Sequence, residues 1–323
     1  AAAAVSHRAG SFLQMVADTQ RLLCRLTGAR FVELFLGSGT LVNDVVAAQL
    51  KVLDGTGLIL SNGEFGERLI DHAGRMGLDF DVLRVPWGSR YDLGKVERRL
   101  QEMPQVSWLW STHCETSCGI LNDLEGLTEI CRRCAVKLCL DCTSSLGTVP
   151  VNLAEVFLAS SVSGKGLASL SGIGLVFYNK AVETDSQIPR YLDLGYYRTK
   201  QGVPFTQSSN LVAALHQALL ELEIPRRFEV IRRQHDLLRR ELSAYGISAM
   251  AAAVSTAPAV LSIRLPREWS SLAWGDALER LGFLLSYRSE YLLKQNIIQI
   301  CLMGKITDDQ CRDLVATIAA LAR

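Results

Sequence analysis

The 323-residue sequence contains no hydrophobic run long enough to cross a membrane. A membrane helix needs roughly 20 consecutive apolar residues, and no uninterrupted run approaches that length. The first eight residues also lack the charged-then-apolar order of a secretory signal. We therefore expect a soluble, cytoplasmic protein that does not interact with membranes.

Neither sign of charge is in excess, since 34 Lys and Arg residues balance 33 Asp and Glu residues for a formal charge of +1. This balance gives no indication of nucleic acid or an anionic surface as a partner. Hydrophobic residues make up 49% of the chain, enough for a sizeable core and a buried oligomer surface. At this length we expect one large α/β domain and a smaller second one.

Complete metal-binding motifs are also missing. Cys131 and Cys134 form one CxxC pair in a basic helical stretch, but no second CxxC and no HxxxH accompanies it. A structural zinc site needs four ligands, so structural thiols are the preferred interpretation. The odd total of nine cysteines argues against a full disulfide framework and favours a reducing compartment.

What the sequence does contain is a regular alternation of strand-like and helix-like patterns. Strands are expected at 31–36, 57–60, 79–85, 107–110, 136–140 and 172–178, with a further apolar run ending at Leu158. Helices are expected at 12–26, from 41 to about 50, and at 91–103. This order predicts a mostly parallel, doubly wound α/β sheet with helices on both faces.

The second half of the chain has a different pattern. Helices are expected at 210–221, from Pro225 to about 245, at 269–281 and from Thr307 onward, with strands at 260–265 and 297–302. Antiparallel strands with flanking helices are typical of a small α+β domain. We therefore predict a large domain over 1–245 and a small C-terminal domain over 246–323.

Lys165 lies in a segment rich in serine and glycine, 160–167, that we expect to be a short loop between two strands. Asp141 directly follows the apolar run 136–140, at a strand end where open α/β sheets bind ligands. A lysine that forms a Schiff base and an aspartate that holds a pyridinium nitrogen together indicate pyridoxal 5'-phosphate. The alternative is a surface lysine and a helix-capping aspartate.

Two further segments favour the same cofactor. Ser38, Gly39 and Thr40 stand between a strand and a helix, where free backbone N–H groups and hydroxyls form a phosphate cradle. Phe65 lies between two glycines at another strand end and would stack on a flat heterocycle. The alternatives are a plain strand–helix connector and a core phenylalanine that closes a loop.

The polar run 111–119 follows the strand at 107–110. His113 and Cys114 raise the alternative of a cysteine hydrolase, but no oxyanion turn accompanies them. Hydroxyl groups of Thr116 or Ser117 that contact the phenolic oxygen of the cofactor fit this run better.

Taken together, these residues resemble the class V group of fold-type I pyridoxal-phosphate aminotransferases, and most of all its 2-aminoethylphosphonate and alanine–glyoxylate branch. The matching landmarks run from residue 6 onward: Ser6-His7-Arg8, Gly37-Ser38-Gly39-Thr40, Asn62-Gly63-x-Phe65-Gly66-x-Arg68, Thr112-His113-x-Glu115-Thr116-Ser117-x-Gly119, Asp141-x-x-Ser144-Ser145-x-Gly147 and Lys165. Their order and spacing are far more specific than any one motif. The resemblance implies a seven-stranded type of sheet and a chain whose N-terminal segment is truncated.

The resemblance also implies roles for individual residues. Lys165 would form the Schiff base and move the proton, and Asp141 would hold the pyridinium N–H. The ring would contact Phe65 and Thr116. Ser38, Gly39 and Thr40 would bind the phosphate, with Ser163 also counted among the cofactor-binding residues. Thr206 matches a threonine that reaches the phosphate of the neighbouring subunit, which implies a homodimer with shared active sites.

Two positions depart from the family pattern. Gly164 stands where the family has Gln or Asn and desulfurases have His, which argues against a cysteine desulfurase. Gln299 stands where the family has an arginine that grips the acid group of the substrate, and Gln lacks that charged fork. The substrate-binding candidates are therefore Gln299 itself and Arg8, with Arg68, Arg198 and Arg288 as further arginines able to replace the missing charge.

The expected function is transfer of an amino group from a small amine, of the 2-aminoethylphosphonate type, to pyruvate or glyoxylate. Two alternatives remain open. One is a pyridoxal-phosphate lyase or decarboxylase, or an alanine– or serine–glyoxylate transaminase, with altered acid recognition. The other is a cofactor-binding protein without turnover, motivated by Gly164 and Gln299.

Overall fold

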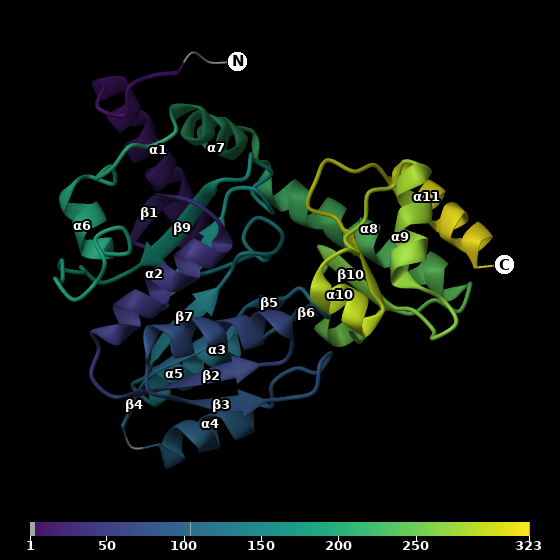
Figure 1. Ribbon diagram of the computed structural model, residues 1–323, viewed down its shortest axis with the longest axis horizontal. Coiled ribbons are helices and arrows are strands. Elements are labelled where there is room, and N and C mark those ends of the chain that lie inside the picture. Colours follow the sequence, from purple (N-terminus) through teal and green to yellow (C-terminus); the bar gives the residue numbers. More distant parts are fainter. Residues whose placement is uncertain (1–3, 104, 323) are drawn as a thin grey trace.

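A seven-stranded sheet forms the centre of the larger part of the computed structural model, which describes residues 4–103 and 105–322 (Figure 1). Its strands are β1 (Phe31–Leu36), β2 (Thr56–Ser61), β3 (Phe80–Arg84), β4 (Val106–Thr112), β7 (Lys137–Asp141), β8 (Leu158–Val162) and β9 (Ile173–Tyr178). A separate short hairpin consists of β5 (Cys114–Glu115) and β6 (Ile120–Leu121).

Within this sheet the strand order is β1-β9-β8-β7-β4-β2-β3. Only β9 is antiparallel to its neighbours, β1 and β8, while β8, β7, β4, β2 and β3 pair in parallel. The carboxyl ends of the parallel strands therefore meet at one edge, which is where such sheets bind ligands. The predicted mostly parallel α/β sheet is confirmed.

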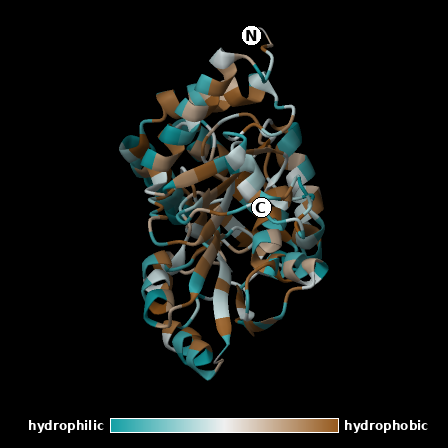
Figure 2. Cartoon of the chain, turned by 90° about the vertical axis from the view of Figure 1, so that its left-hand side faces the viewer, coloured by the Kyte–Doolittle hydropathy of each residue, from teal (hydrophilic) through white to brown (hydrophobic). Residues whose placement is uncertain are grey.

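Helices cover both faces of the sheet. They are α1 (Gly10–Thr27), α2 (Gly39–Lys51), α3 (Glu64–Met76), α4 (Leu93–Glu102), α5 (Leu124–Arg133), α6 (Leu194–Thr199) and α7 (Ser209–Glu221). One hydrophobic cluster joins α1, α4, α5 and α7 to the sheet, and another joins α2, α3 and α6 to its opposite face. Figure 2 shows hydrophobic strands at the centre and helices with hydrophilic stretches around them. Strands covered on both faces are apolar almost throughout, which is why they appear as continuous runs in the sequence.

A second hydrophobic core lies in the C-terminal part, to the right in Figure 1. Its elements are α8 (Ile224–Ser243), a short 3-10 helix (Ala253–Ser255), β10 (Val260–Arg264), α9 (Ser271–Arg280), α10 (Glu290–Gln295), β11 (Ile297–Cys301) and α11 (Asp308–Leu321). The strands β10 and β11 pair in antiparallel fashion, and α11 begins with a capping box between Thr307 and Gln310. The cluster starts at Ile231, so α8 contributes to this core before residue 246 is reached.

One predicted boundary was wrong. A strand was expected to end at Leu158, but β8 begins there and continues to Val162. Its serines are accommodated because Ser160 donates to Oδ1 of Asn43 at 2.6 Å and Ser161 donates to the carbonyl of Cys142 at 3.3 Å. Lys165 still lies in the connection between β8 and β9.

Phe65 was placed between two glycines at a strand end, and no helix was predicted there. Helix α3 begins at Glu64, so Phe65 occupies its first turn. The free N–H groups of Phe65 and Gly66 donate to the carboxylate of Glu115, at 3.3 and 2.9 Å. A distant side chain therefore caps this helix, and nothing in the local sequence marks the cap.

The structure also bears on the cysteines, on metal binding and on membrane-spanning helices. In the part of the chain that the structure covers, no helix has both the length and the apolar character needed to span a bilayer. All nine cysteines are free thiols, and burial raises the pKa of Cys131 to about 12. No group of three or more His, Cys, Asp or Glu residues among the described positions is placed to bind a metal ion.

Glu33, on the edge strand β1, is a buried carboxyl group that makes stability depend on pH. It accepts hydrogen bonds from Tyr178 at 2.9 Å and from Gln20 at 3.0 Å, yet burial raises its pKa from 4.5 to about 7. A raised folded-state pKa gives stability that is present below pH 4.5 and is lost as pH rises through about 7. We therefore expect Glu33→Gln to raise the free energy of unfolding at pH 8 by up to about 3 kcal/mol, measured by urea denaturation. At pH 4.5 the substitution should not raise the free energy of unfolding.

The exposed Glu125 on α5 provides the matched control for this prediction. The Glu125→Gln protein should follow the native pH dependence within about 0.5 kcal/mol. A Glu33→Gln protein that is less stable than the native one at pH 8 would show that the ionised carboxylate stabilises the fold.

Candidate active site

A cavity of about 560 Å³ opens beside the carboxyl ends of β7 and β8. Its lining consists of Gly37, Ser38, Gly39, Thr40, Asn43, Phe65, Arg68, His72, Asp141, Thr143, Val162, Gly164, Lys165, Ser171 and Gly172. Six residues predicted from the sequence to bind the cofactor or act in catalysis are among them. The fold therefore brings together segments that lie more than a hundred residues apart in the chain.

Lys165 projects from the connection between β8 and β9 into this cavity. Its Nζ donates to Oγ of Ser144 at 3.1 Å, and Ser144 also accepts a hydrogen bond from Oγ1 of Thr116 at 2.6 Å. The same amine lies 5.6 Å from the ring centroid of Phe65. Thr116 is absent from the lining itself but is linked to the lysine through Ser144.

Asp141 ends β7 and is only 7% exposed. Its Oδ1 accepts from the backbone N–H of Thr143 at 2.8 Å, and its Oδ2 accepts from Nδ2 of Asn43 at 3.0 Å. Asn43 is held in turn by the hydroxyl of Ser160. These bonds fix the carboxylate in one orientation toward the cavity.

The amino terminus of α2 forms another wall of the cavity. Ser38 is its N-cap residue, but the Ser38 side chain makes no capping hydrogen bond, and no acidic residue lies in the first turn. A Cβ atom added at Gly39 would lie 3.4 Å from Cγ2 of Thr143, so the wall is already closely packed. Oγ1 of Thr143 is buried and has no partner within the described chain. This end of the cavity is therefore suited to an anionic group.

The cavity fits pyridoxal phosphate on these observations. It presents an amine able to bond to an aldehyde, a fixed carboxylate for the ring nitrogen, and the aromatic side chain of Phe65. It also presents an uncapped helix terminus and an unpartnered hydroxyl where the phosphate would lie.

Helix α3 presents three cavity-lining side chains at helical spacing: Phe65, Arg68 and His72. Nδ1 of His72 lies 2.6 Å from Oδ1 of Asp44 on the neighbouring helix α2. Sequence reasoning missed His72 and also Asn43. The only local signal for Asn43 was a polar residue among the valines of the predicted helix.

Other predicted residues lie outside the cavity. Arg8 and Thr206 are exposed. The hydroxyl of Ser163 donates to the carbonyl of Leu170 at 2.6 Å, so it holds the ends of the lysine loop together. Arg198 lies over the ring of Phe31, and Arg288 pairs with Asp276 and Glu279.

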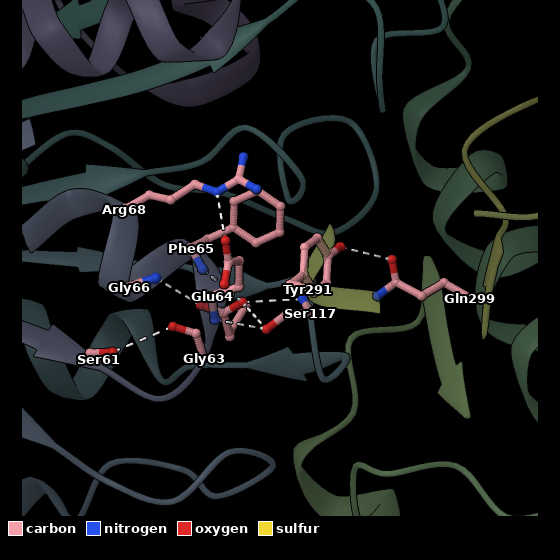
Figure 3. Close-up of polar contacts among 10 residues, drawn as sticks. Ser61, Gly63, Glu64, Phe65, Gly66, Arg68, Ser117, Tyr291 and Gln299 are labelled. Atoms are coloured by element: carbon pink, nitrogen blue, oxygen red, sulfur yellow. Dashed lines mark hydrogen bonds and ion pairs between the residues drawn. The ribbon is translucent and has the colours of Figure 1, made fainter. Parts of the chain in front are cut away.

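Gln299 is buried in β11, where it faces Tyr291 (Figure 3), and its bond to Thr116 connects the two parts of the molecule. Its Nε2 donates to the carbonyl of Thr116 and, at 2.8 Å, to Oγ of Ser262. Its Oε1 accepts from the hydroxyl of Tyr291 at 3.2 Å. Both N–H groups of the Gln299 amide are therefore bonded to protein groups, and Gln299 lies outside the cavity lining.

The alternative of a cysteine hydrolase is not supported by the environment of its residues. Burial raises the pKa of Cys114 to about 12 and lowers the pKa of His113 to about 4. A nucleophilic cysteine needs the opposite shifts, toward a thiolate and a protonated imidazole.

Gly164, which precedes the lysine, has no space for a side chain. A Cβ atom there would lie 2.2 Å from Oγ and 2.7 Å from Cα of Ser171. We therefore expect Gly164→Ala to lower the free energy of unfolding by about 1–3 kcal/mol, measured in urea, because the backbone of Ser171 must move. A larger residue such as Gln would meet the same obstacle.

Gly304 offers a matched control, because a Cβ atom there would meet nothing within 4 Å. Gly304→Ala should change stability by less than about 0.5 kcal/mol. Equal effects of the two substitutions would contradict the expected clash with Ser171.

Comparisons with known proteins agree with this geometry. The family model described as aminotransferase class-V matches residues 1–198. The 2-aminoethylphosphonate–pyruvate transaminase of Pseudomonas fluorescens (strain Pf0-1) is 28% identical over 303 residues, covering 89% of this chain and 81% of the relative. The soluble hydrogenase 42 kDa subunit of Anabaena cylindrica is 29% identical, covering 98% and 86%.

Among solved structures, the alanine–glyoxylate aminotransferase from Nostoc sp. superimposes with a TM-score of 0.89 at 25% sequence identity. The match covers 100% of this chain and 90% of that chain. The sheet, the cavity and the family model lead to one conclusion: the chain belongs to the class-V aminotransferase family and is a transaminase whose cofactor is pyridoxal phosphate.

Proposed function

We propose that this enzyme transfers an amino group from a small amine donor that carries an acid group, of the 2-aminoethylphosphonate type, to pyruvate or glyoxylate. The observation that carries this proposal is the convergence of Lys165 and Asp141 on one cavity with an uncapped helix terminus. The names of the relatives supply the substrate classes: one is a 2-aminoethylphosphonate–pyruvate transaminase and another an alanine–glyoxylate aminotransferase.

In this proposal the residues of the cavity divide the work. When bound, the cofactor supplies an electron sink for the bonds at the amine carbon. Lys165 would hold the cofactor covalently until the amine of the donor replaces it, and its freed Nζ, oriented by Ser144, would then move a proton between two carbons. Asp141 would keep the ring nitrogen protonated. Phe65 would pack against the ring, and the amino terminus of α2 would bind the phosphate.

We further propose a homodimer that acts in the cytoplasm. Thr206 is exposed and lies outside the cavity lining of its own chain, which suits a residue that reaches the cofactor of a neighbouring subunit. Nine free thiols suit a reducing compartment. The proposed division into domains stays at 1–245 and 246–323, with the end of α8 packed into the smaller core.

An absorbance experiment tests the activity. The purified protein, loaded with cofactor, is scanned before and after addition of 2-aminoethylphosphonate or L-alanine, and then of pyruvate or glyoxylate. We expect the visible band to bleach with the amine and to return with the keto-acid. Product formed in excess of the enzyme without any keto-acid would indicate a lyase or decarboxylase instead, and a band that never responds would indicate a protein without turnover.

A further inference from the structure

We propose that Arg68 is the residue that binds the acid group of the amine donor, taking over the charge that position 299 lacks. The proposed function supplies the donor, a short amine with a carboxylate or phosphonate. Arg68 is the only arginine in the described lining of the cavity. Of the other basic side chains there, Lys165 is needed for the chemistry, and Nδ1 of His72 lies 2.6 Å from Oδ1 of Asp44.

The guanidinium group of Arg68 is positioned by two aromatic rings (Figure 3). Its Cζ lies 4.9 Å from the ring centroid of Phe65 and 5.9 Å from that of Tyr291, and the two rings meet edge to face at 6.0 Å. Such stacking holds the planar group in place and leaves its edge free for an acid.

Most of the hydrogen-bonding capacity of Arg68 is unused. Its Nε donates to Oε1 of Glu64 at 3.1 Å, and its side chain is 50% exposed. Neither Nη1 nor Nη2 donates to an acceptor within the described part of the protein. Two parallel N–H groups of this kind match a carboxylate or phosphonate.

Tyr291 contacts both Arg68 and Gln299, the residue at the position where the family pattern has arginine. The hydroxyl of Tyr291 donates to Gln299, and the guanidinium group of Arg68 lies over the ring of the same tyrosine. The positive charge of Arg68 on α3 is therefore separated only by the ring of Tyr291 from Gln299, the position where the family pattern has arginine. Gln299 cannot compete for the acid, because its amide is occupied by Thr116, Ser262 and Tyr291.

Hydrogen bonds to the polar loop hold the first turn of α3 in place and so fix the position of Arg68. Glu115 is fully buried and accepts hydrogen bonds from the N–H groups of Phe65 and Gly66 in the first turn of the helix. Oγ of Ser117 accepts a hydrogen bond from the N–H of Glu64 at 3.0 Å. The turn that carries Phe65 is thus fixed to the polar loop, and Arg68 follows one turn later.

The test compares Arg68→Gln with the native holoenzyme on three donors: 2-aminoethylphosphonate, L-alanine and n-propylamine, which has no acid group. We expect kcat/KM to fall by about 30- to 100-fold for the two acids, and by less than about 3-fold for n-propylamine. A second readout does not depend on turnover: calorimetric binding of ethylphosphonate and of propionate to the holoenzyme should weaken by a similar factor. Weakening for only one of them would identify which acid the site takes.

Arg75→Gln is the matched control, because Arg75 lies on the same helix and pairs with Asp71 four residues away, as Arg68 pairs with Glu64. Arg75→Gln should leave kcat/KM for all three donors and the binding of both acids unchanged. Arg68→Lys keeps the charge without the fork and should recover only part of the loss.

Equal losses of Arg68→Gln on acid and acid-free donors, or unchanged binding of both acids, would overturn the assignment of Arg68. Failure of the native enzyme to transfer an amino group from any donor would instead overturn the proposed function. The calorimetric comparison would still decide the role of Arg68 in that case.

Discussion

Replacing Lys165 with alanine should reduce the rate of transamination by at least about 10⁴-fold, the largest effect that we expect from any single substitution. Under the proposed function two contributions would be lost together, the covalent attachment of the cofactor and the transfer of the proton by the same amine. Because the Nζ of Lys165 donates to Ser144 and no other lysine lines the described cavity, no neighbouring amine is placed to substitute for it. The rate is measured with the amine donor that bleaches the native enzyme and with pyruvate.

Borohydride reduction followed by peptide mass analysis checks the chemical basis of this prediction. The native protein should carry the reduced cofactor on the peptide that contains Lys165, and the Lys165→Ala protein should carry none. Lys180→Ala is a suitable control because Lys180 is exposed and lies outside the cavity. An adduct on a lysine other than Lys165 would contradict the assignment.

The fold could be predicted from sequence because its signals are local. Apolar runs bounded by glycine and polar residues marked most strands of the sheet, and Gly28 adopts the left-handed conformation (φ 72°) expected at the end of α1. The prediction failed where polar side chains are satisfied by distant partners. Ser160 lies inside β8 because Asn43, 117 residues away, accepts its hydrogen bond. The first turn of α3 is capped by Glu115, which no local pattern reveals.

The same distinction applies to the site. Asp141 ends a strand, and Lys165 and Phe65 follow shortly after strands; because the carboxyl ends of the parallel strands lie at a common edge, their meeting could be anticipated. The role of Gln299 as a link to Thr116 could not, because it depends on how the C-terminal part packs against the sheet. The position of Arg68 over Phe65 and Tyr291 is likewise a result of tertiary packing.

Asp141→Asn should lower kcat/KM for the amine donor by about 10²- to 10³-fold while leaving the fold intact. The substitution keeps the size of the side chain and an oxygen that can accept from the N–H of Thr143, but its NH2 group cannot accept from Nδ2 of Asn43. It also removes the negative charge that would keep the ring nitrogen of the cofactor protonated. Without that charge the cofactor withdraws electrons less strongly from the amine carbon. The measurement is steady-state kinetics with equal cofactor loading, checked by absorbance.

Asn43 has a positioning role in the same geometry. Substituting Asn43 tests the orientation of the Asp141 carboxylate separately from its charge. Asn43→Leu removes the donor to Oδ2 of Asp141 but leaves the bond from the N–H of Thr143, so the carboxylate keeps its charge and loses one of two restraints. We expect a smaller loss, about 5- to 10-fold. A cofactor analogue with a methylated ring nitrogen carries a permanent positive charge and should restore at least about 10-fold of the activity to Asp141→Asn, but not to Asn43→Leu. If the analogue restored neither variant, or if Asp141→Asn kept more than a third of the native activity, protonation of the ring would not be the function of this carboxylate.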